Sequence, residues 1–238
     1  MSPETIGLIG IGLLVFLFLL RVPVGFSMFI SGFVGFAYLN GLESALLLLP
    51  QDAFDTFSSY PLSVIPTFIL MGCFAFASGI SQRLYATSYT WVGSLRGGLT
   101  IATVLACSGF AAICGSTAAT AATMGKIALP EMRKYKYNDS FATGTVASAG
   151  TLGILIPPST VFIVYGILTE ESIGRLFLSG IMPGAILTLL FIATVAILCT
   201  VNPSLGPAGP ATTWKEKFVS LGGIIEAIIL FALAVGGL

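Results

Sequence analysis

The chain has 238 residues, of which 56% are hydrophobic and only 8% are charged, whereas an average soluble domain has roughly 25% charged residues. This composition excludes a water-soluble globular protein and indicates an integral membrane protein. Ten basic and ten acidic side chains give a net charge of zero, so a basic surface that binds nucleic acid is not expected. The chain has no histidine, which removes Ser-His and Cys-His nucleophile pairs and the usual zinc sites.

Two apolar runs at the N-terminus predict a tight pair of membrane helices. Thr5–Leu20 ends at Arg21, and Val22–Leu39 follows directly. The first run is interpreted as a retained helix and not a signal peptide, because it has no basic n-region and no small-residue cleavage site. The next stretch, Asn40–Tyr60, carries three acidic residues around a short apolar run, which predicts an extramembrane or interfacial arm.

Further spans follow along the chain. A third span is predicted over Pro61–Ile80, and the segment behind it mixes cations with amphipathic aromatic residues, as is typical of the cytoplasmic membrane interface. These residues are Arg83, Tyr85, Tyr89, Trp91 and Arg96. Later apolar segments cover Gly98–Leu129, Ser140–Leu168, Ile181–Thr200 and Ser220–Leu238. Four cysteines in apolar stretches without CxxC spacing are expected to be small buried hydrophobic residues; they are Cys73, Cys107, Cys114 and Cys199.

The distribution of charge predicts the orientation in the membrane. With the N-terminus outside and alternating spans, all but one of the cations lie on or toward the cytoplasmic side, as the positive-inside rule requires. They are Arg21, Arg83, Arg96, Lys126, Arg133, Lys134, Lys136, Lys215 and Lys217, and Arg175 is the exception. The opposite loops hold Glu4, Glu43, Asp52, Asp55, Glu170 and Glu171.

This topology requires one segment that does not cross. Gly98–Leu129 has cations on both flanks, so both of its ends are expected on the same side, and a re-entrant helical hairpin is predicted. Its centre reads Gly115-Ser116-Thr117, which is turn chemistry at the position of a hairpin tip. Each arm of about 15 residues reaches roughly 23 Å, which places the tip inside the membrane.

A second irregular point is predicted over Gly153–Ser159. Pro157 and Pro158 break the helix there, and because proline has no N–H, the carbonyls of Gly153 and Ile154 lose their helical donors. This break lies about as far past the preceding cation as the hairpin tip does. Irregular backbone at membrane depth is tolerated only inside protein or beside a water-filled cavity, so two such points at matched depth predict one shared site.

An oxygen-only site of this kind suits a hard monovalent cation such as Na+. Freed carbonyls and helix ends offer partial charges, and hydroxyls of Ser116, Thr117, Ser159 and Thr160 flank both breaks. A single Ser or Thr in a membrane helix usually bonds its own helix or a neighbouring one, so the hypothesis depends on the pair of breaks. Glu226, which lies inside an apolar run, is left outside the site, because a partner helix or a protonated state explains it equally well.

The motifs resemble those of the large membrane (permease) subunit of tripartite ATP-independent periplasmic (TRAP) transporters. The resemblance rests on GSTAATAA from Gly115, LPEM from Leu129 and GTLGILIPPS from Gly150, with further agreement at PTFIL from Pro66 and LRGGL from Leu95. It implies Na+-coupled uptake of an organic acid, such as a C4-dicarboxylate or sialic acid, across a bacterial or archaeal inner membrane. It also implies a small membrane subunit and a periplasmic substrate-binding protein as partners, and an elevator movement of the hairpin-containing region. No organic cofactor is implied.

By its motifs, the resemblance assigns the Na+ site to the two breaks. The candidate ligand residues are Gly115, Ser116, Thr117, Gly153, Ile154, Ile156, Pro157 and Ser159. The predicted fold is an all-α integral membrane protein with a re-entrant hairpin and a discontinuous helix. It is divided into a scaffold over residues 1–96, a transport region over 97–180 and further spans over 181–238. Residues that would bind the organic acid are not identified.

One departure concerns length. Family members are about twice as long and contain a second, inverted repeat, so the chain resembles their N-terminal half. A non-transporting scaffold that needs a second half is therefore the alternative hypothesis. An enzyme is not expected, because a rhomboid-like dyad needs histidine, and Asp52, Asp55 and Asp139 lie in polar connections where an aspartyl protease would need aspartates at membrane depth.

Overall fold

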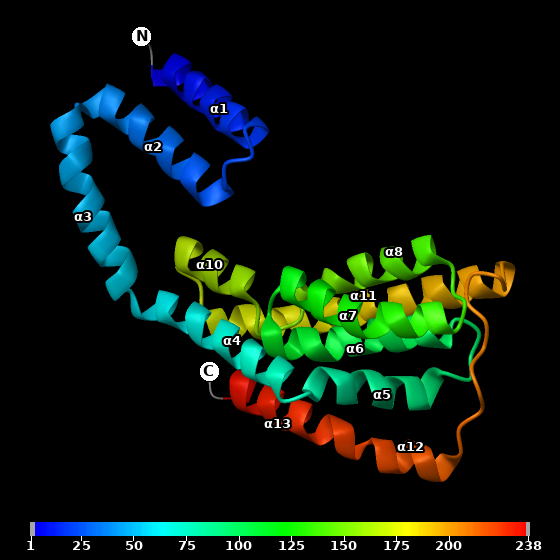
Figure 1. Cartoon of the computed structure of the whole chain (residues 1–238). Helices are drawn as coiled ribbons and strands as arrows, with labels where there is room; N and C mark the ends of the chain where they lie inside the picture. Colours follow the sequence, from blue (N-terminus) through cyan, green and yellow to red (C-terminus); the bar gives the residue numbers. More distant parts are fainter. Residues whose placement is uncertain (1–2, 237–238) are drawn as a thin grey trace. The chain divides into compact units, whose positions relative to one another are not determined.

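The computed structural model describes residues 3–236, apart from the side chains of residues 3, 60 and 61. Within these residues every regular element is a helix, which confirms the all-α prediction (Figure 1). Among these described residues, three stretches are long and apolar enough to cross a membrane: Asp139–Thr169, Ile173–Val201 and Trp214–Gly236. The helices Leu42–Ser58 and Leu62–Ala77, with a bend at the break between them, would add a fourth if they form one span. The last two residues of the predicted segment Ser220–Leu238 lie outside the described part of the chain.

The helices follow one another with short connections, except before α12. In chain order they are α1 (Pro3–Leu19), α2 (Val24–Asn40), α3 (Leu42–Ser58), α4 (Tyr60–Ala77), α5 (Ile80–Val92), α6 (Gly98–Cys114), α7 (Thr117–Lys134), α8 (Asp139–Gly150), α9 (Leu152–Leu155), α10 (Thr160–Thr169), α11 (Ile173–Val201), α12 (Trp214–Ser220) and α13 (Gly222–Gly236). They form two compact units, Met1–Tyr60 and Pro61–Leu238.

In the first unit, α1 and α2 lie side by side as an antiparallel pair (Figure 1). The Ser31 hydroxyl donates a hydrogen bond to the carbonyl of Gly10 at 2.7 Å, so the pairing of the two helices is confirmed, although both are shorter than the candidate membrane spans. Gly41 joins α2 to α3 with a φ of 90°, a conformation that favours glycine. The stretch predicted as an arm is the helix α3.

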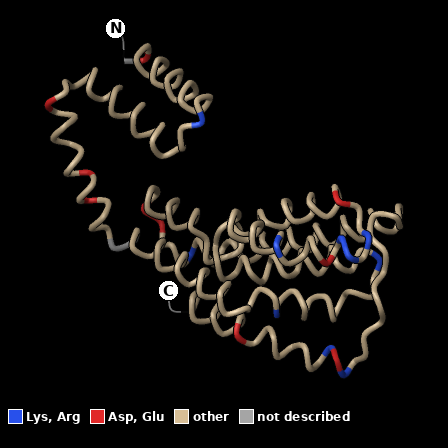
Figure 2. Tube along the Cα trace, viewed as in Figure 1, with Lys and Arg blue, Asp and Glu red and all other residues tan. Residues whose placement is uncertain are grey.

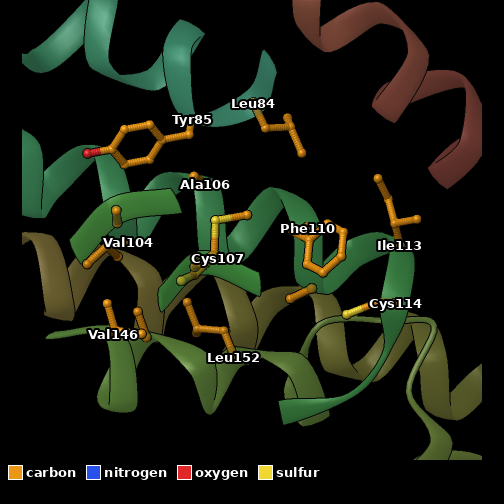
Figure 3. Packing of buried hydrophobic residues seen from close by; sticks show 14 of the residues in the cluster. Leu84, Tyr85, Val104, Ala106, Cys107, Phe110, Ile113, Cys114, Val146 and Leu152 are labelled. Atoms are coloured by element: carbon orange, nitrogen blue, oxygen red, sulfur yellow. The ribbon is translucent and has the colours of Figure 1, made fainter. Parts of the chain in front are cut away.

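The second unit is built around α6, which contacts α5, α7, α8, α9, α11 and α13. Figure 3 shows its side chains, among them Phe110 and Cys107, between the helices on both sides. Ala102 and Ala106 on α6 have no exposed surface. Small residues of this kind let helix backbones approach closely, which matters in a bilayer because lipid removes most of the hydrophobic drive for helix association.

The segment after the third span differs from the prediction. Residues 80–92 form the helix α5 along the side of α6, and Leu84 and Tyr85 are buried in the core (Figure 3). Tyr85 is therefore not an interfacial aromatic residue. Arg83 lies near the start of α5, most of a helix length away from Arg96 in the next turn, so these two cations do not share one end of the unit as the charge count assumes.

A connection that the sequence analysis did not single out ties one end of this unit together. Residues 202–213 run from α11 to α12 past the α5–α6 and α7–α8 turns (Figure 1). The N–H of Gly97 donates to the carbonyl of Gly206 at 2.9 Å, and that of Asn138 donates to Leu205 at 3.3 Å. The Tyr137 hydroxyl donates to the Pro207 carbonyl at 2.8 Å.

Two expectations need adjustment. Cys107, Cys114 and Cys199 are buried, but Cys73 on α4 is exposed, because it borders an open pocket between α4 and the α6–α7 hairpin. The boundary predicted after residue 96 falls in the α5–α6 turn, whereas the one predicted after residue 180 falls inside α11, a continuous helix that runs through Pro183. Gly180 and Pro183 resemble a helix stop in the sequence, but the helix continues through both.

Candidate functional site

The hairpin turn between α6 and α7 lies at the residues for which the sequence predicts it. Gly115 ends α6 in the left-handed conformation, with a φ of 59°, which only glycine adopts without strain. Ser116 is extended and caps α7, its hydroxyl oxygen accepting from the N–H of Ala119 at 3.4 Å. Helix α7 then begins at Thr117. The turn is therefore encoded locally by a glycine and an N-cap serine.

The break between α9 and α10 is also where the two prolines predict it, and the peptide between Pro157 and Pro158 is cis. One expectation about it is wrong. The carbonyl of Ile154 does not lack a donor, because the buried Ser159 hydroxyl bonds to it at 2.7 Å. The hydroxyl of Ser159, five residues after Ile154, therefore takes the place of the missing N–H donor. The helical donor of the Gly153 carbonyl would be the N–H of Pro157, which proline does not have.

The turn and the break are in direct contact. The carbonyl of Gly115 accepts from the N–H of Thr160 at 3.4 Å and from its hydroxyl at 3.3 Å. A Cβ atom added at Gly115 would collide with the carbonyl oxygen of Pro158, and one added at Gly153 would lie 2.7 Å from the backbone of Ser116. Backbone therefore packs on backbone, with no room for a side chain at either glycine.

Helix α11 supports the break from the other side, which the sequence analysis missed. A Cβ atom at Gly180 would lie 2.7 Å from the carbonyl oxygen of Leu155, and one at Gly184 would lie 2.8 Å from the side chain of Ile156. The spacing of these two glycines is the small-xxx-small pattern of close helix packing. This glycine spacing is the sequence feature from which the contact between α11 and the break could have been predicted.

The predicted ligand residues of the break have different surroundings. Ile154 is 42% exposed and Ile156 packs against α11, while Pro157 is fully buried. The Ser159 hydroxyl donates its hydrogen within the break and leaves oxygen lone pairs. Ile154, Ile156 and Pro157 therefore shape the break, and their side chains offer no ligand atom.

One polar atom at the contact has no partner in the described part of the chain. The Thr117 side-chain oxygen is buried and makes no hydrogen bond, although an unpaired buried hydroxyl costs roughly 1–3 kcal/mol. It belongs to the residue whose backbone N–H lies against Gly153. By contrast, the Ser116 carbonyl accepts from the N–H of Thr120 at 2.9 Å. Within the described residues, the Thr117 oxygen thus lacks a partner and the Gly153 carbonyl lacks its helical donor.

The electrostatic character of the contact follows from its helix ends. α6 and α9 end here, and α7 and α10 begin here. Helix C-termini carry partial negative charge and N-termini partial positive charge. The donor set consists of hydroxyl and carbonyl oxygens without a carboxylate, which fits a weakly held monovalent cation such as Na+ better than a divalent or soft metal.

A pocket of about 310 Å³ borders the hairpin turn on the side of α4. It is lined by Ile69, Gly72, Cys73, Phe76, Phe110, Cys114, Ser116, Ala119 and Thr123. Its polar side chains, Ser116 and Thr123, belong to α7 and its cap. The pocket therefore leads from the surface of this unit to one residue of the predicted tip.

Glu226 lies apart from the contact and has a partner. On α13 it forms an ion pair with Arg83 of α5, two residues that the sequence analysis treated separately. An acidic residue inside an apolar span is costly unless a cation compensates it. The pair therefore joins α13 to α5, and neither residue contributes to the site.

Comparison with known proteins yields a family and several relatives. The model of the DctM component of tripartite ATP-independent periplasmic transporters matches residues 11–238. The chain is 39% identical over 207 residues to the C4-dicarboxylate TRAP transporter large permease protein of Pseudomonas aeruginosa, covering 84% of the chain and 48% of the relative. It is 36% identical over 227 residues to the corresponding Vibrio cholerae protein, with coverage of 95% and 49%. The sialic acid TRAP transporter large permease protein of V. cholerae is 29% identical over 218 residues, with coverage of 91% and 50%. The chain thus spans about half the length of these relatives.

Proposed function

Because the chain belongs to the family of the DctM component of TRAP transporters, we propose that it supplies one Na+ site for the coupled uptake of an organic acid. The Na+ ion is cotransported cargo in this proposal. The observation that supports it is the contact between the hairpin turn and the broken helix, which leaves the Thr117 oxygen buried without a partner.

Binding of Na+ here would join two parts of the second unit. The Thr117 oxygen belongs to the hairpin and the Gly153 carbonyl to the broken helix, so a cation shared between them adds a bond across the contact. The Ser116 and Ser159 oxygens complete the proposed set with their free lone pairs. In the absence of Na+ the two segments are held by the weaker Thr160 to Gly115 hydrogen bonds, 3.3 and 3.4 Å long.

The substrate, partners and location are proposed from the relatives. The names of the matched relatives specify C4-dicarboxylates and sialic acid, so we propose a carboxylate substrate. We further propose an inner-membrane location with the N-terminus on the periplasmic side, a small membrane subunit, a periplasmic binding protein and an elevator movement. The relatives carry names of permease proteins and not of enzymes, in agreement with the sequence-based expectation.

A Na+ titration of the purified chain tests the site without the partners. A ligand that binds only the folded state at 100 times its dissociation constant stabilises it by about 2.7 kcal/mol. We expect the thermal unfolding temperature in detergent to rise with NaCl at constant ionic strength, and to stay unchanged with KCl or choline chloride. Equal stabilisation by all three salts would contradict a specific Na+ site.

A labelling experiment tests the re-entrant hairpin. The native cysteines are replaced, and a single cysteine is introduced at Leu95 or at Lys134, both of which are exposed. Each variant is treated with a membrane-impermeant maleimide from either side of the membrane. Leu95 is preferred to Gly97, because a Cβ at Gly97 would lie 2.6 Å from the Cys199 sulfur. Reaction of both positions from the same face is expected. Reaction from opposite faces would make this segment an ordinary span.

The second candidate function is a non-transporting scaffold that only assembles with a further half. Uptake separates the two functions. The chain is co-expressed with the remaining half of a relative, the small membrane subunit and the binding protein. Na+-dependent uptake that Thr117→Val weakens supports the proposed site, whereas uptake that is indifferent to Thr117→Val supports the scaffold.

A further inference from the structure

Both tryptophans of the chain lie where α5 meets α12, away from the Na+ site. The Lys217 ammonium lies 5.2 Å from the ring centroid of Trp214 and 6.0 Å from that of Trp91. The Trp91 indole N–H donates to the Lys217 carbonyl at 3.2 Å, and the rings of Trp91 and Phe218 meet edge to face at 6.3 Å. This aromatic and lysine cluster has no part in the proposed ion binding.

The cluster is held in place by hydrogen bonds before any ligand arrives. Thr213 and Glu216 form a reciprocal capping box at the start of α12, with a bond of 2.8 Å from the Thr213 N–H to the Glu216 carboxylate. The Thr212 hydroxyl donates to the carbonyl of Thr90 on α5 at 2.7 Å. A rigid site loses less entropy on binding than a mobile one.

Positive charge collects around the same end of the second unit (Figure 2). The turn that carries Arg96 is bonded to the connection leading into α12. The Lys134 ammonium lies 5.8 Å from the ring centroid of Tyr135, which packs at 6.2 Å against Tyr89 of α5. An anionic ligand would therefore meet a positive surface.

The nearby carboxylates already have partners. Asp139 pairs with Arg133 at 3.0 Å, and Glu216 accepts from its own helix cap. Among the residues that the structure describes, neither Lys215 nor Lys217 has a carboxylate within ion-pair distance. Their ammonium groups remain available to a ligand.

The outer side of α12 is apolar and uncovered within this chain. Trp214, Phe218 and Val219 are 70%, 64% and 73% exposed. They begin the 23-residue apolar stretch that is long enough to cross a membrane, so they lie at the membrane surface if the stretch spans. A groove of about 460 Å³ beside them is lined by Thr90, Thr212, Lys215, Glu216, Val219 and Ser220. Aromatic residues and lysines at the end of a span are the usual contacts of lipid head groups.

We infer that α12 and the end of α5 bind an anionic phospholipid of the surrounding leaflet. Its phosphate meets Lys217 beside the two tryptophans, Lys215 adds positive charge nearby, and its acyl chains lie against Trp214 and Phe218. Charge complementarity selects an anionic over a zwitterionic head group, because the uncompensated ammonium groups attract net negative charge. The apolar side chains select a lipid over a soluble phosphate.

Tryptophan fluorescence tests this inference directly, because both fluorophores belong to the cluster. The full chain is reconstituted in equimolar phosphatidylglycerol and phosphatidylcholine, with bromine on the acyl chains of one lipid or the other. Bromine quenches an indole that it contacts. We expect stronger quenching by brominated phosphatidylglycerol than by brominated phosphatidylcholine, and a smaller difference at high salt, which screens exposed charges. Free inorganic phosphate at millimolar concentration should not reduce the difference.

Three variants show whether the lysines cause the selectivity. Each lysine near a charged membrane surface contributes about 1 kcal/mol, so Lys215→Gln and Lys217→Gln should each lower the preference for phosphatidylglycerol about fivefold. Lys126→Gln, which removes an exposed charge from α7, is the matched control and should leave it unchanged. Lys215→Arg with Lys217→Arg should retain it.

Several results would overturn the inference. They are equal quenching by both brominated lipids, a preference that survives both glutamine variants, and weak quenching by either lipid, which would mean that protein covers α12. Circular dichroism of each variant verifies the helical fold, so that a lost preference is not mistaken for unfolding.

Discussion

Two irregular stretches of the second unit differ in how far their polar groups are hydrogen-bonded. The connection over residues 202–213 pairs with the turns beside it, through Gly206, Leu205 and Pro207. The hairpin turn and the broken helix also hydrogen-bond to each other, but some of their described polar groups stay unpaired. Among the described residues, this contact leaves the Thr117 side-chain oxygen without a partner and gives the Gly153 carbonyl no helical donor.

This difference separates a structural connection from a candidate site. Where a polar group already has a partner within the chain, as the Tyr137 hydroxyl has in the Pro207 carbonyl, it needs nothing further, and its loss should affect stability alone. Where a buried oxygen is left over, a ligand can compensate it, and its loss should affect the response to that ligand. The variants below test each half of this distinction.

The largest effect is expected for Gly115→Ala at the contact. The added Cβ would strike the Pro158 carbonyl, and the residue would keep an unfavourable positive φ. We expect loss of the folded state and of Na+ stabilisation, measured by size-exclusion yield and thermal unfolding. Gly144→Ala is the matched control, because its Cβ would meet nothing within 4 Å, and it should be neutral or stabilising by up to about 1 kcal/mol. Equal behaviour of the two variants would contradict the close contact.

The sequence predicts the turn and the break because both are local. Gly115, Ser116 and the two prolines determine backbone geometry wherever they occur. By contrast, the burial of Tyr85 depends on which face of α5 meets α6, and the Ser159 to Ile154 hydrogen bond depends on how the chain turns after the prolines. Neither is visible in composition or periodicity.

The pairing of Arg83 with Glu226 is also a long-range property, since the two residues are 143 positions apart. An arginine and a glutamate that far apart in the chain form no recognisable sequence pattern. The connection over residues 202–213 was likewise missed, because glycine and proline there indicate a loop but not the turns it binds. Local chemistry therefore predicted the two halves of the candidate site, and tertiary packing determined its supports.

The next largest effect concerns that ion pair, where the polar groups are complete within the chain. Arg83→Met leaves the Glu226 carboxylate uncompensated in an apolar span and should cost about 3 kcal/mol, measured by denaturation in mixed micelles. Arg83→Met with Glu226→Met should recover most of the loss, because no charge is left unpaired. A double variant as unstable as the single one would show that Arg83 acts through packing.

Tyr137→Phe tests the hydrogen bonds that the Tyr137 hydroxyl makes at the connection. The change removes the bond to the Pro207 carbonyl and the acceptor that the Leu99 N–H uses at 3.3 Å. We expect a loss of about 2 kcal/mol of unfolding free energy, with the stabilisation by Na+ unchanged. A shifted Na+ midpoint would mean that this end of the unit and the candidate site are coupled.

The same tyrosine gives a prediction for alkaline pH. Burial raises the pKa of Tyr137 to about 12, above the value of about 10 in an unfolded chain. Between these values the unfolded chain loses the proton first, so stability is complete below pH 10 and falls as the pH rises toward 12. The difference in tyrosinate absorbance between the wild type and Tyr137→Phe reports this tyrosine alone, and it should titrate near pH 12. A difference that titrates near 10 would contradict the burial of this hydroxyl.

The smallest change in energy tests the central claim most directly. Thr117→Val removes one oxygen and keeps the shape of the side chain, and loss of a ligand contribution of about 1.4 kcal/mol weakens binding tenfold. In the Na+ titration of thermal unfolding, the midpoint of the stabilisation should rise about tenfold for Thr117→Val. It should stay at the wild-type value for Thr194→Val, whose hydroxyl only bonds its own helix at 2.8 Å. A Thr117→Val midpoint equal to that of the wild type would show that Na+, if it binds, is held elsewhere.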